Sequence, residues 1–246
     1  MVQCLYPPLI KFILRIDIND VENPTIETLR DIASKLEDMG YSEPTRIKLI
    51  SSKGPDSQLI FAPIRFLSEK EGNEILIFRD SIYFQYNEKY PRWDDILPKI
   101  LSNFFYLSEK LNILVIKNIS FDYIDLFTNF SQNRFELKSY FNISIKYQPE
   151  FDIDYKDFII GLRLNTEESS HKSILRIRGL KPNTEEFYKI QLETHYEIQE
   201  EIEINEKDQL KDNLNYVHDY LLKYFKFVLS ERTKKMIVMD DGANSQ

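Results

Sequence analysis

The sequence predicts an α+β fold with two antiparallel-sheet subdomains, in which helices pack on the N-terminal sheet and one long C-terminal helix lies across the second sheet. Segments that alternate apolar and polar residues are joined by short turns, which favours antiparallel strands. Helical patterns interrupt the first half of the chain and close the second half. Of the 246 residues, 42% are hydrophobic and 13% are aromatic. The chain can therefore bury a sizeable core.

Local patterns predict the elements of the N-terminal subdomain, residues 1–121. Residues 9–19 alternate as a half-buried strand does. A helix follows, for which we expect Asn23 as the N-cap and Gly40 as the left-handed residue that ends it. The apolar spacing that begins at Trp93 predicts a second helix and a largely buried indole ring. Further strands are expected near residues 45–51, 58–67, 74–79, 82–87 and 112–121.

The segment 122–134 is the predicted connection between the subdomains. It mixes turn-forming residues with apolar ones, so we expect a short docked helix there. The C-terminal subdomain, 135–238, should contain four strands and a long helix capped by Asn205, followed by a flexible tail, 239–246. The likeness between residues 12–19 and 158–165 is too weak to indicate an internal repeat. The four strands are expected near residues 136–147, 155–165, 171–179 and 187–199.

Charge and composition disfavour several classes of protein. The formal net charge is -8, whereas nucleic-acid binders and proteins that bind anionic membranes carry a basic face. The single cysteine, Cys4, cannot form an intramolecular disulfide, and with three histidines it does not suggest a zinc site. No signal-peptide pattern and no membrane-spanning apolar run are visible. We therefore expect a cytoplasmic protein without metal, cofactor or membrane partner.

The motifs of catalysis are weak or missing. His218-Asp219 would suit a metal-dependent phosphohydrolase only with further histidine and aspartate ligands, and the other two histidines, His171 and His195, fall in predicted strands. We therefore expect His218 to be structural, at the edge of a buried helical stripe. Residues 151–157, with three aspartates, lack the glycine of a calcium-binding loop. No nucleophile or phosphate-binding motif occurs, so we assign no catalytic residues.

Three groups of side chains are candidates for contacts with a partner. The first group is a set of aromatic residues near one turn. The second is two arginines on one strand face with a lysine in the turn that follows. The third is a run of glutamates, more than are needed to favour the start of the next helix. These residues are Tyr83, Tyr86 and Tyr90; Arg176, Arg178 and Lys181; and Glu200, Glu201 and Glu203.

Four stretches together resemble a sporadically distributed hypothetical-protein family of bacteria and archaea: residues 6–18, 64–95, 113–119 and 214–237. Where that family has an arginine in the strand after the second helix, this chain has Lys117 and Asn118. The resemblance implies no catalytic residues, and such patchy occurrence is typical of mobile-element and defence genes. Its motif positions are Pro7, Pro8 and Leu9; Arg65 and Ser68; Tyr90, Pro91 and Trp93; and Leu214, His218 and Phe225.

These observations favour a non-catalytic protein-binding or regulatory module that acts within a complex, in a prokaryotic defence or toxin-control locus. The partner would be another protein or a second copy of the chain. Two alternatives stay open. One is a nucleic-acid-binding or processing factor that uses the basic strand 175–182, and the other is a hydrolase with dispersed carboxylates.

Overall fold

The computed structural model describes residues 9–46, 63–68, 70–87, 92–131, 140–142, 159–164, 166, 168–180 and 187–236. The helices are α1 (Ile26–Glu37), α2 (Trp93–Lys110), α4 (Lys207–Val228) and α5 (Glu231–Met236). The strands of the first half are β1 (Leu9–Ile18), β2 (Thr45–Arg46), β3 (Ile64–Ser68), β4 (Asn73–Ile77) and β5 (Ser81–Asn87). Those of the second half are β6 (Val115–Ser131), β7 (Ile159–Leu164), β8 (His171–Leu180), β9 (Phe187–Ile198) and β10 (Ile202–Glu203).

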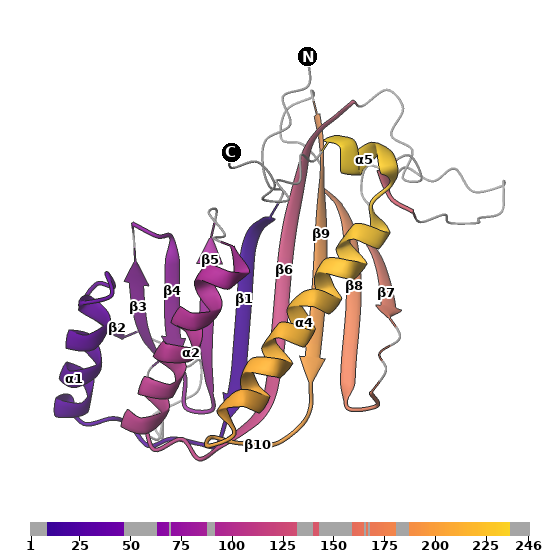
Figure 1. The fold of residues 1–246 in the computed structure, drawn as a ribbon. Coiled ribbons are helices and arrows are strands. Elements are labelled where there is room, and N and C mark those ends of the chain that lie inside the picture. The colour runs from indigo at the N-terminus through magenta and orange to yellow at the C-terminus, as the bar shows by residue number, and fades with distance from the viewer. Residues whose placement is uncertain are drawn as a thin grey trace, which may run out of the picture.

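All strands join one antiparallel sheet in the order β2-β3-β4-β5-β1-β6-β9-β8-β7, and β10 pairs with β6. Figure 1 shows α1, α2 and α4 on the same side of this sheet, with α4 running obliquely across the strands of the second half. The predicted α+β class, the antiparallel pairing and the long C-terminal helix are confirmed. The strand predicted over 112–121 becomes β6, so the two predicted groups of strands meet where β6 pairs with β9.

The order of connections is the same in the two halves of the sheet. β1 pairs with β5, the last strand of the meander β3–β5, and β6 pairs with β9, the last strand of the meander β7–β9. Each meander leads into a long helix, α2 or α4. Because β1 and β6 pair antiparallel in the middle, the two halves are related in topology by a two-fold axis. The counterpart of β1 is therefore β6, and the faint likeness between residues 12–19 and 158–165 points to the wrong strand, β7.

The prediction of a docked helix over 122–134 is wrong, because β6 continues through Ser131. It pairs with β9 over its length, from Ile119 opposite Ile198 to Ser131 opposite Phe187, with one irregularity after Phe127. Backbone pairing with a neighbouring strand outweighs the local turn preference of residues such as Asn129. The division into domains at this segment stays a prediction.

Two helix caps differ from the expected ones. The side chain of Thr25, rather than Asn23, accepts a hydrogen bond from the Thr28 N–H and caps α1. At α4 the N-cap is Glu206, without a side-chain cap, rather than Asn205. Gly40 has a φ of 87°, the left-handed conformation that was expected after α1. The prediction for the tail, and most of the predicted strand 136–147, lie outside the described residues.

Trp93 connects α2 and α4 above the centre of the sheet. Its indole N–H donates to Asn215 Oδ1 of α4 at 2.8 Å, and its ring stacks on His218 with centroids 4.6 Å apart. The ring also packs against Phe12 of β1 and Phe121 of β6, each at 6.1 Å. Only 9% of Trp93 is exposed, which agrees with its expected burial.

Trp93→Ala should lower the free energy of unfolding by about 3–5 kcal/mol, because both the ring contacts and the bond to Asn215 are lost. Urea unfolding followed by circular dichroism measures this, since Trp93 is the only tryptophan and its fluorescence disappears with the substitution. The control is Phe227→Ala on α4, where the ring is 68% exposed and the change should stay within about 0.5 kcal/mol. Equal losses in the two variants would contradict the anchoring role of Trp93.

Candidate functional site

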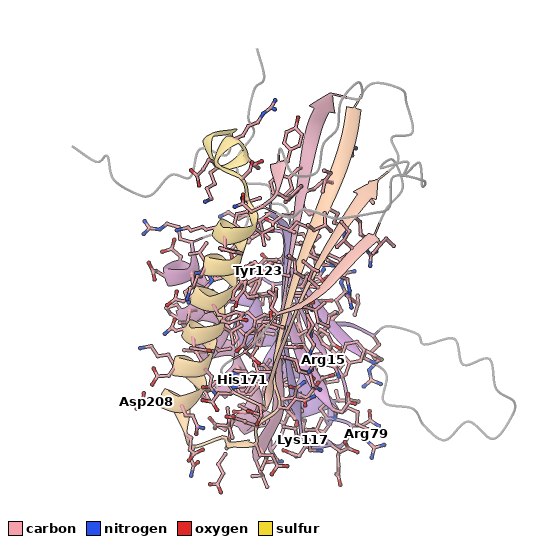
Figure 2. All side chains as sticks on the ribbon, turned by 90° about the vertical axis from the view of Figure 1, so that its right-hand side faces the viewer. Arg15, Arg79, Lys117, Tyr123, His171 and Asp208 are labelled. Carbon is pink, nitrogen blue, oxygen red and sulfur yellow. The ribbon has the colours of Figure 1, made fainter. Side chains whose placement is uncertain are left out.

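No described helix covers the sheet face opposite α4, which we call the open face. Figure 2 shows α4 with Asp208 on one side of the sheet and Arg15 on the other. Since side chains alternate along a strand, each buried residue is followed by one that points to this face. In the middle and second half of the sheet, the open face includes Lys11, Ile13, Arg15 and Asp17 (β1); Tyr83 and Gln85 (β5); Asn118, Ser120, Asp122 and Ile124 (β6); Gln191, Glu193, His195 and Glu197 (β9); and Lys172, Ile174, Arg176 and Arg178 (β8).

Charged side chains pair along one row of the open face. Arg15 Nε donates to Asp17 Oδ1 at 2.5 Å, and its guanidinium carbon lies 5.4 Å from the centre of the Tyr83 ring. Tyr83 thus contributes to the open face, and its role as a contact residue stays a prediction. Tyr86, however, faces the helices and is only 4% exposed, so it is a core residue. The alternation of β5 separates the two tyrosines, and Tyr90 lies outside the described residues.

A histidine–aspartate pair lies near the centre of the open face. His195 Nδ1 and Asp122 Oδ1 are 2.8 Å apart, with Ile13 and Ile174 as their cross-strand neighbours. Such a pair can move a proton, but nucleophilic catalysis also needs a hydroxyl or thiol in contact with the imidazole. Among the described residues, no serine, threonine or cysteine side chain hydrogen-bonds the imidazole of His195; Ser173 Oγ donates only to its backbone carbonyl, at 3.2 Å. The sequence analysis missed this pair because its members are far apart in the chain and meet only through the register of β6 and β9.

Arg176 and Arg178 lie side by side on the open face, as their spacing predicts. Each has a guanidinium nitrogen 3.6 Å from Glu193 Oε2, a distance too long for a hydrogen bond. The other oxygen of Glu193 accepts from Gln191 at 2.6 Å. Neither arginine side chain donates a hydrogen bond to any residue that the structure describes, and Nε of Arg178 is buried without an acceptor. Lys181, the third member of this predicted cluster, lies outside the described residues.

The predicted glutamate group lies elsewhere, where β9 leads into β10. Glu200 accepts from Ser170 Oγ at 2.6 Å and lies 3.6 Å from His171 Nε2. Glu201 and Glu203 are exposed. Glu200 therefore links the end of β9 to Ser170 and His171 at the start of β8. The sheet does not bring these glutamates together with the arginines.

His218 holds α4 to the sheet. Its Nδ1 is 2.8 Å from the hydroxyl of Tyr123 on β6, and its ring stacks on Trp93. Burial lowers the pKa of His218, and the charges of Asp219 and Asp94 oppose this only in part. The neutral imidazole is thus favoured, which suits a structural contact. The bonding partner is a phenol rather than the backbone carbonyl or carboxylate that is usual for such a histidine.

Asp125 is a carboxyl group inside the core, on the helix-facing side of β6. It is 4% exposed, and no described residue forms a hydrogen bond or ion pair with it. Its neighbours across the sheet are Leu9 and Leu192. Burial raises the pKa of Asp125 to about 8, because a charged carboxylate in apolar surroundings is unfavourable. Asp125 lies between Tyr123 and Phe127, which belong to two different hydrophobic clusters.

The described residues contain neither a cluster of metal ligands nor a membrane-spanning helix. No group of three or more histidine, cysteine, aspartate or glutamate side chains among the described residues is arranged to hold a metal ion. In the same part of the chain, no helix has the length and apolar character that crossing a membrane requires. Neither models of protein families nor curated proteins match the chain.

His218→Gln should cost at most about 1–1.5 kcal/mol of stability, because the amide can still reach the Tyr123 hydroxyl. His218→Ala should cost more, since it also removes the ring that stacks on Trp93. Thermal unfolding of both variants measures the order. Loss of partner binding by either variant at an unchanged melting temperature would show that His218 is a site residue instead.

Asp125→Asn should flatten the dependence of stability on pH. Between the unfolded pKa of about 3.9 and the folded value of about 8, the unfolded chain is ionised at this position while the folded chain is protonated. Unfolding then releases a proton, so stability falls as pH rises, by up to about 1.4 kcal/mol per pH unit, and levels off above the folded pKa. Asparagine cannot ionise and removes this contribution.

Urea unfolding at pH values across that window measures the slope in the wild type and in Asp125→Asn. Asp212→Asn, on the exposed side of α4, is the matched control and should keep the wild-type slope. Equal slopes in the wild type and Asp125→Asn would show that Asp125 is ionised in the folded protein.

Proposed function

We propose that the protein is a non-catalytic module that binds another protein through the open face. The observation that carries this proposal is an extended sheet face, free of any described helix, on which apolar and charged side chains alternate. Ile13, Ile124 and Ile174 are only partly buried there, next to ion-paired and basic groups. A mixture of apolar contacts with a charged surround is typical of protein interfaces.

The arrangement of the titratable groups supports binding rather than catalysis. The His195–Asp122 pair has no nucleophile bonded to it among the described residues, and Asp125 is buried away from solvent. The resemblance to a sporadically distributed prokaryotic family supports a complex in a defence or toxin-control locus as the context.

Nucleic acid is a weaker candidate for the partner. Lys172 pairs with Glu197 at 3.8 Å, and Glu193 lies between the two arginines, so carboxylates are built into the same surface. Each phosphate contact would meet this negative charge and the net charge of -8 of the chain.

Ile174→Glu should greatly reduce the amount of partner that copurifies with the protein from cells, because the substitution places a charge in the middle of the open face. Native mass spectrometry of the purified complex identifies the partner and measures its occupancy, and a complex of identical chains would identify a second copy. Phe227→Glu, on the exposed side of α4, is the control and should keep the complex. Retention of the partner by Ile174→Glu, with loss in Phe227→Glu, would place the interface on the helical side and overturn the proposal.

A further inference from the structure

Arg176 and Arg178, here called the arginine pair, have more hydrogen-bonding capacity than their surroundings use. Each guanidinium group has five N–H donors, and the pair shares a single carboxylate at 3.6 Å. No described residue accepts a hydrogen bond from either side chain, and Nε of Arg178 is buried without an acceptor. A buried donor without a partner is unfavourable, so an incoming acceptor would relieve this cost.

Within the ion pairs between β8 and β9, the basic side chains are also more exposed than the acidic ones. The side chains of Arg176 and Arg178 are 45% and 39% exposed, whereas that of Glu193 is 17% exposed. The same holds for Lys172 at 41% and Glu197 at 23%. Arg163 of β7 and Lys189 of β9 add exposed basic side chains to the same part of the open face. A molecule that approaches the paired side chains of β8 and β9 therefore meets positive charge first, although the chain as a whole has a net charge of -8.

We propose that the arginine pair binds carboxylate groups of an acidic protein segment that lies in extended form over β8 and β9. This inference rests on the proposed function and names the chemistry of the partner. Planar guanidinium groups match carboxylates, with two parallel hydrogen bonds for each pair.

The spacing of the arginine pair fits an extended segment. Residues two apart on one strand are about 6.5–7 Å apart, and the side chains of alternate residues in an extended peptide have the same spacing. An acidic segment with a carboxylate at every second residue can therefore place one carboxylate on each arginine. Its other face would remain free for further contacts.

The observations favour acidic protein over nucleic acid as the occupant. Affinity for nucleic acid grows with the number of phosphates neutralised. Beside the arginine pair, the described residues of this part of the open face offer Arg163, Lys189 and Lys172, and Lys172 already pairs with Glu197. Asp122, Glu193 and Glu197 would lie under the remaining phosphates. A protein segment can instead place its few carboxylates on the arginines and its apolar side chains on Ile174 and Ile124.

The test uses the full chain and three probes of similar length in isothermal titration calorimetry at physiological ionic strength. The first is a peptide that alternates glutamate and threonine, the second replaces each glutamate by lysine, and the third is single-stranded oligothymidine. The glutamate peptide should bind, and the lysine peptide should not. The double variant Arg176→Gln, Arg178→Gln should bind the glutamate peptide with an affinity about tenfold lower or weaker still. Replacement of both arginines by lysine should give an intermediate affinity, because the charge is kept and the paired hydrogen bonds are lost.

Arg79→Gln is the matched control, since Arg79 is 65% exposed and pairs with Asp20 away from β8. It should leave the affinity for the glutamate peptide unchanged. Absence of binding, equal affinity in the double glutamine variant, or tighter binding of oligothymidine than of the glutamate peptide would overturn the proposal.

The complex from cells separates this proposal from the proposed function. If the double glutamine variant keeps the cellular partner and Ile174→Glu loses it, the open face binds a protein but the arginine pair does not recognise it. If both variants keep the partner, the open face is not the interface. Loss of the partner in both variants, with binding of the glutamate peptide, supports both proposals.

Discussion

The antiparallel pairing of β1 with β6 is the constraint on which the rest of the structure depends. It joins the two halves of the sheet, and its register places Phe12, Leu14 and Ile16 opposite Tyr123, Phe121 and Ile119 on the helix-facing side. A slip of one residue would exchange the two faces of a strand and expose these apolar side chains. The same register therefore decides that Arg15 and Asp122 reach the open face. The register of β1 against β6 thus determines both which side chains form the core and which side chains form the candidate interface.

The aromatic contacts above this central pair explain why the helices occupy only one face. Trp93 of α2 and His218 of α4 stack on each other, and both reach down to residues of β1 and β6. Asp125 follows Tyr123 on the same side of β6 and is the one ionisable group among the described buried residues of that strand. An ionisable group thus lies between residues of the two hydrophobic clusters, and its burial favours the neutral form.

The parts of the fold that the sequence predicts correctly are those with a strong local period. The strand β1 and the helices α1, α2 and α4 each have apolar residues at regular spacing. The end of β6 has turn-forming residues such as Asn129, and only its pairing with β9 makes it a strand. The arginine pair is visible in the sequence because residues two apart share a strand face. The contact of His195 with Asp122 and the shared partner Glu193 depend on register between strands, which no local pattern encodes.

The placement of Glu193 between Arg176 and Arg178 has a consequence for recognition. Glu193 attracts both guanidinium groups without hydrogen-bonding either of them, so it restricts their positions while most of their donors stay available. Holding a side chain in place before binding reduces the entropy that is lost on association. Charge complementarity of this kind contributes more to specificity and to the rate of encounter than to affinity. Apolar contacts can add to the affinity, because Ile174 lies two residues before Arg176 on β8 and Ile124 of β6 lies opposite Glu193.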